Sequence, residues 1–172
     1  MEKMVTKFET FMTIQLGTGL KTGDDFTNAI RDIGDSVDFD TYCWLKNYNF
    51  KTVSEPTELD LVVASMEQLG FPNGAWIRDI DNRAWNRFGL ERCPCEVGPQ
   101  LRLQYREQPK GERLVIAMET FIDVYQTQVH FAVQHTSRNG RELNTYGRSI
   151  GDRDWCQYGG ELRWVFVQAS KQ

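Results

Sequence analysis

The sequence predicts an α+β fold in which N-terminal helices pack on a twisted antiparallel β-sheet in the C-terminal part. Apolar residues recur at helical spacing in the first 90 residues, whereas every second residue is apolar over much of 100–168. The chain has 172 residues, and domains most often contain about 100–150 residues. We therefore expect a single domain over 1–172, with a helical part over about 1–90 and a β part over about 94–170.

The helical part is predicted to begin after one strand. Alternating apolar residues within 8–16 indicate a half-buried strand. Thr22 and Asp25 have the spacing of a capping box, and the apolar stripe that follows predicts a helix that ends at Gly34. The segment 38–52 is rich in aromatic residues and fits either a short helix or an extended chain.

Two further helices are expected to form a helical hairpin over about 55–88. The first would span 54–69, because Leu59, Val62, Val63 and Met66 fall on one helical stripe. A four-residue connector, 71–74, would lead into a helix that ends at Gly89.

The β part is predicted from alternation and turn signals. Leu101, Leu103 and Tyr105 alternate with polar residues, and 114–118 is a short apolar run that suits a central strand. Alternation over 128–134, followed by Asn139-Gly140, predicts a β-hairpin whose return strand spans 142–148. Alternating apolar residues predict a last strand near the C-terminus: Leu162, Trp164 and Phe166.

Charge is distributed unevenly along the chain. The net charge is −4, and residues 1–60 contain 11 acids and 6 bases, whereas 61–172 contain 13 acids and 14 bases. The bases of the second part are mostly arginines, which suits either a solvated surface or a partner-binding surface. No signal peptide and no apolar run of about 18 residues is evident, so we expect a cytoplasmic protein with reduced cysteines and no membrane contact.

One block of sequence is similar to a known family. Residues 93–105 read CPCEVGPQLRLQY, and QPKGE and IAM follow at 108–112 and 116–118. This block resembles a family of uncharacterised bacterial proteins, as do the segments 13–26, 58–71 and 164–167. The family pattern has Ala where this chain has Cys95 and Pro where it has Thr120, and the region 121–160 is more divergent. The resemblance implies no activity, cofactor or catalytic residue.

The residues that bind metals or act as nucleophiles do not form a recognised motif. Cys93, Cys95 and Cys156 are soft metal ligands, as are His130 and His135, but two histidines five residues apart point to opposite faces of a strand. A Cys–His pair involving Cys93 or Cys95 has no motif to support it. We therefore expect no metal site and no cofactor.

The candidate site is a polar row in the block that carries the resemblance. If Gln100, Arg102 and Gln104 share one face of a strand, they form a polar row with Glu96 and Glu112 at its ends. The solvent face of an antiparallel sheet is normally polar, which is the simplest interpretation. The ligand- or partner-binding candidates are six residues: Glu96, Arg102, Gln104, Tyr105, Gln108 and Glu112.

Three functions are compatible with these observations. The first is a non-catalytic binding or interaction domain that recognises a protein or a small polar ligand through the polar face around 96–112. The second is a small hydrolase that uses Glu96 and Glu112 as paired carboxylates. The third is a nucleic-acid-binding protein, which the acidic composition and the mixing of arginines with Asp79 and Asp81 disfavour. The oligomeric state is left open.

Overall fold

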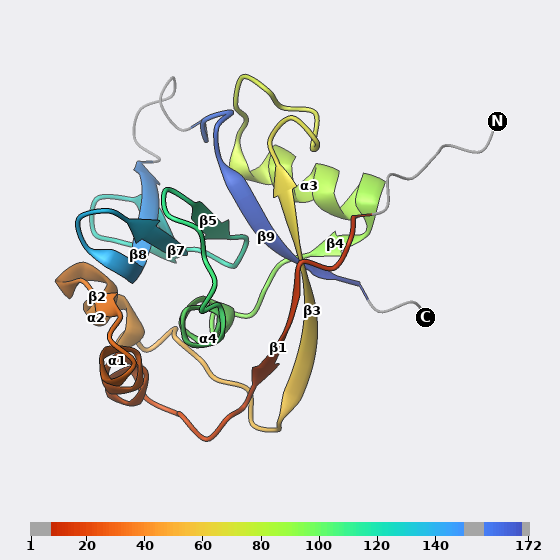
Figure 1. Ribbon diagram of the computed structural model, residues 1–172. Coiled ribbons are helices and arrows are strands. Elements are labelled where there is room, and N and C mark those ends of the chain that lie inside the picture. The colour runs from red at the N-terminus through yellow and green to blue at the C-terminus, as the bar shows by residue number, and fades with distance from the viewer. Residues whose placement is uncertain (1–7, 150–156, 170–172) are drawn as a thin grey trace.

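The computed structural model describes residues 8–149 and 157–169 (Figure 1). In this part of the chain, nine strands form one sheet and four short helices pack against it. The helices are α1 (Gly23–Asp32), α2 (Phe39–Leu45), α3 (Ile77–Phe88) and α4 (Val97–Gln104). The strands are β1 (Met12–Leu16), β2 (Ser36–Val37), β3 (Thr57–Ser65), β4 (Leu90–Glu91), β5 (Arg113–Ile116), β6 (Phe121–Ile122), β7 (Thr127–Thr136), β8 (Gly140–Ser149) and β9 (Arg163–Gln168).

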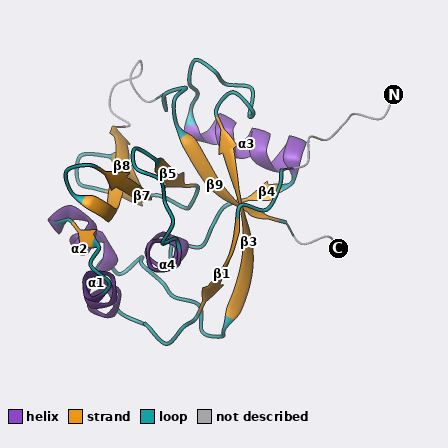
Figure 2. Cartoon of the chain, viewed as in Figure 1, coloured by secondary structure: helices purple, strands orange, loops and turns teal. Residues whose placement is uncertain are grey.

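The sheet is mixed and strongly curled. Its strand order is β1-β3-β9-β5-β7-β8-β2, with β4 added beside β9 and β6 beside β7. The pairs β5–β9 and β2–β8 are parallel, and the other pairs are antiparallel. Helix α4 contacts β1 at one end of this order and also β7 and β8 near the other end, so the sheet curls around α4 (Figures 1 and 2).

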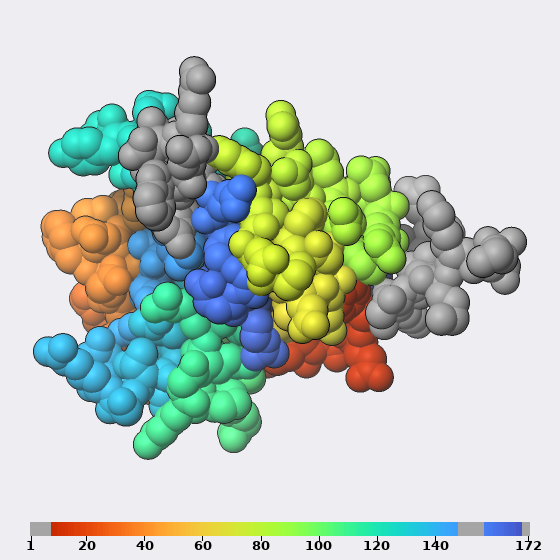
Figure 3. All heavy atoms as spheres, turned by 90° about the horizontal axis from the view of Figure 1, so that it is seen from above, coloured from red at the N-terminus to blue at the C-terminus, as the bar shows by residue number. Residues whose placement is uncertain are grey.

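Both faces of the central strands are buried. Leu114 and Ile116 of β5 belong to the core shared with α1, α2 and α4, whereas Val115, between them, belongs to a second core that includes residues of α3. Figure 3 shows the segment from the end of β3 through α3, coloured yellow to lime, beside β9. Strands covered on both faces read as continuous apolar runs, as 114–118 does.

The predicted helical hairpin is wrong. Residues 57–65 form β3, which lies between β1 and β9 and pairs antiparallel with both. Leu61 packs into the core on one face and Val62 into the core on the other. A strand buried on both faces has apolar residues at nearly every position. Such a run also places apolar residues at the spacing of a helical stripe, so the pattern by itself does not distinguish the two structures.

The predicted division into a helical N-terminal part and an antiparallel C-terminal part is wrong at two segments. The first is 57–65, which forms a strand in the part predicted to be helical. Residues 97–104, predicted as the first strand of the sheet, form α4. The sheet already begins with β1 and β3, and it is mixed rather than antiparallel. The polar sheet face proposed from Gln100, Arg102 and Gln104 therefore does not exist, because these side chains project from a helix.

Elements with strong local signals are confirmed. The second half of the strand predicted over 8–16 is present as β1, and the capping box of α1 forms between Thr22 and Asp25 through two hydrogen bonds of 3.1 and 2.9 Å. Helix α3 ends at Gly89, whose φ of 65° is the left-handed conformation that glycine adopts easily. The hairpin at Asn139-Gly140 joins β7 to β8, and the last predicted strand is β9. No helix in the described ranges is long and apolar enough to cross a membrane.

His130 on β7 is enclosed in the second core. Its ring contacts the rings of Tyr158 and Trp164. Nδ1 donates to the Ile116 carbonyl at 2.9 Å, because a carbonyl can only accept, and Nε2 lies 3.0 Å from the Tyr158 hydroxyl. Burial lowers the pKa of His130 to about 4, so the ring is neutral at pH 7.

The buried histidine predicts a pH-dependent loss of stability. As pH falls from about 6.5 to about 4, the histidine of the unfolded chain gains a proton and the buried one does not, which lowers the free energy of unfolding by about 3 kcal/mol. Urea unfolding of the wild type and of His130→Gln at pH 7 and pH 4.5 measures this contribution. The variant should lose less stability on acidification, and equal losses in both proteins would contradict the prediction.

Gly98 allows α4 to lie directly on β7. A Cβ atom at this position would lie 2.7 Å from Cβ of Phe131 and 2.9 Å from two of its ring atoms. Phe131 is fully buried in a close-packed core, so its side chain cannot easily move away from an added methyl group. We expect Gly98→Ala to destabilise the protein by about 1–3 kcal/mol, with Asn28→Ala on the exposed face of α1 as a near-neutral control. Equal unfolding midpoints in the two variants would refute the close contact.

Candidate ligand site around helix α4

One polar face of α4 fastens the helix to the edge strand β1. The Gln104 amide pairs with the backbone of Gln15: Nε2 donates to the Gln15 carbonyl at 2.8 Å, and Oε1 accepts from the Gln15 N–H at 2.9 Å. One turn earlier, Gln100 Nε2 donates to the Thr18 hydroxyl at 2.8 Å. The contacts of Gln104 satisfy backbone groups of β1 that an edge strand would otherwise leave unpaired.

Glu96 continues this polar face at the start of α4 and is fully buried. Its Oε1 accepts from the Gly17 N–H at 2.9 Å and from Gln100 Nε2 at 3.1 Å. Its Oε2 accepts from the Val53 N–H at 2.7 Å. The carboxylate is thus enclosed and its oxygens are occupied by donors of the chain itself. Glu96 joins three segments of the fold and is not open to a ligand.

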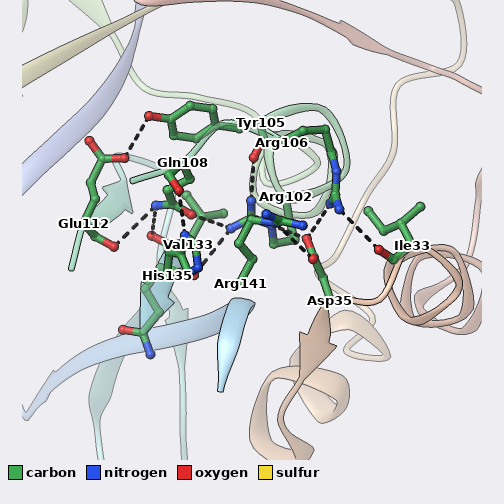
Figure 4. A network of polar contacts seen from close by, with 11 residues as sticks. Ile33, Asp35, Arg102, Tyr105, Arg106, Gln108, Glu112, Val133, His135 and Arg141 are labelled. Atoms are coloured by element: carbon green, nitrogen blue, oxygen red, sulfur yellow. Dashed lines mark hydrogen bonds and ion pairs between the residues drawn. The ribbon is translucent and has the colours of Figure 1, made fainter. Parts of the chain in front are cut away.

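Arg102 projects from another face of α4 into the interior (Figure 4). Its guanidinium is fully buried, and Nε lies 2.9 Å from Asp35 Oδ2. Nη2 donates to the Tyr105 carbonyl at 2.6 Å, and Nη1 donates to Gln108 Oε1 and to the Gln134 carbonyl. Burial lowers the pKa of Arg102 to about 10, and the charge of Asp35 partly offsets this effect. The side chain therefore remains a cation at neutral pH.

Two further arginines form ion pairs with Asp35. Arg106 Nη1 donates to its Oδ2 at 2.6 Å, and Arg141 Nε donates to its Oδ1 at 3.2 Å. Figure 4 shows these side chains converging on Asp35, which directly precedes β2. Sequence reasoning missed Asp35 and Arg141, because residues 106 positions apart show no local pattern that would join them.

Beyond the C-terminus of α4, Tyr105 and Glu112 form a second part of the network. The Tyr105 hydroxyl donates to Glu112 Oε2 at 2.9 Å, and Arg163 Nη1 of β9 lies 2.8 Å from Oε1. Burial, together with the hydrogen bond to Glu112, raises the pKa of Tyr105 to about 12. The hydroxyl keeps its proton at neutral pH, so Tyr105 fixes the position of the Glu112 carboxylate.

Gln108 links this carboxylate region to β7. Its buried side chain donates from Nε2 to the Val133 carbonyl at 3.2 Å, and its own backbone carbonyl lies 2.6 Å from His135 Nδ1. Since that carbonyl only accepts, Nδ1 of His135 carries a proton. In the neutral ring, Nε2 is then an acceptor with a fixed orientation.

Glu112 and His135 line a cavity of about 430 Å³. Small-molecule sites typically have volumes of about 300–1,000 Å³, so this volume suits a small ligand. The lining comes from the turn before β5, the ends of β5 and β7, and the start of β9: Gly111, Glu112, Arg113, Gln134, His135, Thr136, Glu161, Leu162 and Arg163.

The structure separates the six residues predicted as a site. Glu112 lines the cavity, and Tyr105 and Gln108 support it from behind. Arg102 lies deeper in the same network. Glu96 and Gln104 belong to the opposite polar face of α4 and contact β1 or the loops beside it.

The positions of Glu96 and Glu112 disfavour the paired-carboxylate geometry. Glu96 precedes α4, whereas Glu112 is held by Tyr105 just after α4. An eight-residue helix is about 12 Å long, which exceeds the separation of about 5–10 Å in paired-carboxylate hydrolases. The two side chains also share no hydrogen-bond partner in the described part of the chain. This arrangement disfavours the hydrolase hypothesis.

The cysteines and histidines are also kept apart. Burial raises the pKa of both the Cys93 and the Cys95 thiol, which disfavours the nucleophilic thiolate. His130 lies in the second core, whereas His135 contacts Gln108 on the other face of β7, as the five-residue spacing predicts. Within residues 8–149 and 157–169, no three His, Cys, Asp or Glu residues are grouped to hold a metal ion. Cys156 lies outside the described residues.

The arginines of α3 do not form a phosphate-binding stripe. Arg83 donates to the Leu69 carbonyl at 3.1 Å and stacks on Phe71. Arg87 lies over the ring of Phe88. These contacts engage the arginines in packing, which adds no support for nucleic-acid binding.

No family model, curated protein or solved structure matches the chain. The block over 93–118 that the sequence analysis singled out covers α4, the turn that follows it and β5. Its polar residues fasten α4 to β1 and build the network behind Glu112. Many of the polar residues in this block therefore have a structural role.

The enclosed carboxylate of Glu96 gives a direct test of this structural role. In Glu96→Gln, an amide group would replace one of the two oxygens that accept from Gly17 and Val53, and a buried N–H donor would lose its partner. We expect the free energy of unfolding to fall by about 2–4 kcal/mol. Denaturant unfolding compares this variant with Glu107→Gln at an exposed position after α4. A similarly small effect of both substitutions would contradict the role of Glu96.

Proposed function

We propose that this protein is a non-catalytic binding domain for a small zwitterionic ligand, which it holds in the cavity lined by Glu112 and His135. The observation that carries the proposal is the presence of both cationic and anionic groups in one small cavity. Arg113 and Arg163 contribute positive charge, and Glu112 and Glu161 contribute negative charge. Such a lining suits a molecule with an ammonium and a carboxylate group.

Several of these groups have hydrogen-bonding capacity left for a ligand. Arg113 uses Nε to reach Gln134 Oε1 at 2.8 Å, and Arg163 uses Nη1 to reach Glu112; among the described contacts, their remaining guanidinium N–H groups have no partner. Among the described residues, Glu161 has no hydrogen-bond or ion-pair partner. In the tautomer with its single proton on Nδ1, His135 adds Nε2 as an acceptor beside these charges.

The groups behind the cavity are suited to binding rather than to proton transfer. Tyr105 and Arg163 each hold one oxygen of Glu112, and the Gln108 carbonyl fixes His135. The hydroxyl of Thr136 accepts from the Asn139 N–H at 3.0 Å, and no hydrogen bond joins it to His135 in the described structure. The cavity thus has positioned recognition groups and no activated nucleophile, which favours a binding role.

A mixture of free amino acids is the first probe of this proposal. Ligand-observed NMR with wild-type protein should detect at least one that binds saturably. Arg163→Gln should weaken that binding by about tenfold or more, because one charge-assisted contact to the ligand carboxylate is lost.

The control is Arg78→Gln, which removes an exposed arginine on α3, away from the cavity. This variant should bind like the wild type. If no amino acid binds, or if both variants bind as the wild type does, the zwitterion site is refuted.

A further inference from the structure

The cluster around Asp35 has more positive charge than its carboxylate neutralises. Arg102, Arg106 and Arg141 all form ion pairs with Asp35, which gives three cations for one anion. No other carboxylate within the described ranges lies at ion-pair distance from these arginines. Arg102 by itself would balance the buried Asp35, so Arg106 and Arg141 leave a local excess of two positive charges.

The excess charge lies on the accessible side of the cluster. The Arg102 side chain is fully buried, whereas those of Arg106 and Arg141 are 35% and 29% exposed. Nη1 and Nη2 of Arg102 donate hydrogen bonds within the protein, and its Nε lies at ion-pair distance from Asp35. Arg106 uses Nη1 and Nη2, the latter with the Ile33 carbonyl at 3.2 Å, but not Nε. For Arg141, the described contacts involve Nε and leave both Nη groups available.

Asp35 holds the two exposed guanidinium groups close together. Arg106 contacts Oδ2 and Arg141 contacts Oδ1 of the same carboxylate, so both groups lie within reach of a single anion. They come from separate elements, since Arg106 follows α4 and Arg141 lies on β8. Their orientation is set before any ligand arrives, which lowers the entropic cost of binding.

We propose that Arg106 and Arg141 form a binding site for the phosphate group of a small molecule. A phosphate monoester carries a charge of about −1.5 to −2 at pH 7, which matches the excess of two positive charges. Arginine binds phosphate oxygens through paired N–H donors, and both Nη groups of Arg141 can supply such a pair. Neither Arg106 nor Arg141 lines the cavity of Glu112 and His135, so this site is separate from the proposed zwitterion site.

Inorganic phosphate is the probe for this site. Titration into ¹⁵N-labelled full-length protein, observed through the arginine Nε–H signals, should give saturable shifts of Arg106 and Arg141. Arg106→Gln and Arg141→Gln should each weaken phosphate binding by about tenfold. Arg141→Lys, which keeps the charge but loses the paired donors, should bind more weakly than the wild type and more tightly than Arg141→Gln.

Two controls separate this site from general attraction of anions and from the proposed cavity. Arg113→Gln, in the cavity lining, should leave phosphate binding unchanged. Succinate, a dianion with planar carboxylates, should bind more weakly than phosphate. Absence of saturable phosphate binding in the folded wild type, wild-type phosphate affinity in both Arg106→Gln and Arg141→Gln, or equal affinity of the wild type for succinate and phosphate would overturn the assignment. Loss of amino-acid binding in the cavity would leave this proposal unaffected.

Discussion

The burial of the Arg102 guanidinium beside Asp35 is the interaction on which the arrangement around α4 depends. A buried charge is costly unless it is paired and its donors are satisfied. Here the pairing brings together the end of α4, the residue before β2, and the backbone of β7. Each partner lies on a different element, so the charge can be accommodated only when the sheet has curled around the helix.

The sheet can curl around α4 only if the helix approaches the strands closely. Gly98 removes the side chain where α4 meets Phe131 of β7. On the other side of the helix, the amide of Gln104 binds β1 and that of Gln100 binds Thr18, just beyond β1. Helix α4 is therefore held from two sides, by apolar contact with β7 and by hydrogen bonds to β1.

The two proposed binding sites lie at the C-terminal end of α4 and share its polar network. One end of the network, at Glu112 and His135, opens into a cavity of mixed charge. The other end, at Arg106 and Arg141, presents positive charge. The residues between them are buried and hydrogen-bonded, which keeps the exposed groups in defined positions.

Sequence alone determined the elements whose signals are local. The capping box at Thr22, the glycine that ends α3 and the Asn139-Gly140 turn act within a few residues, so the sequence was sufficient to predict them. It also pointed to 93–112 as the segment in which to look for a site. The structure places Glu112, Tyr105 and Gln108 at or behind the cavity, and their binding role stays a prediction.

Tertiary structure decided the segments whose apolar pattern fits two conformations. Residues 57–65 form a strand because β1 and β9 supply hydrogen bonds and cores on both faces, and none of these neighbours is visible in the segment itself. The alternation at 101–105 was also compatible with a helix that buries Leu101 and Arg102 together. The pairing of Asp35 with Arg141 depends on a sheet that joins distant segments, because contacts across 106 residues leave no periodic signal.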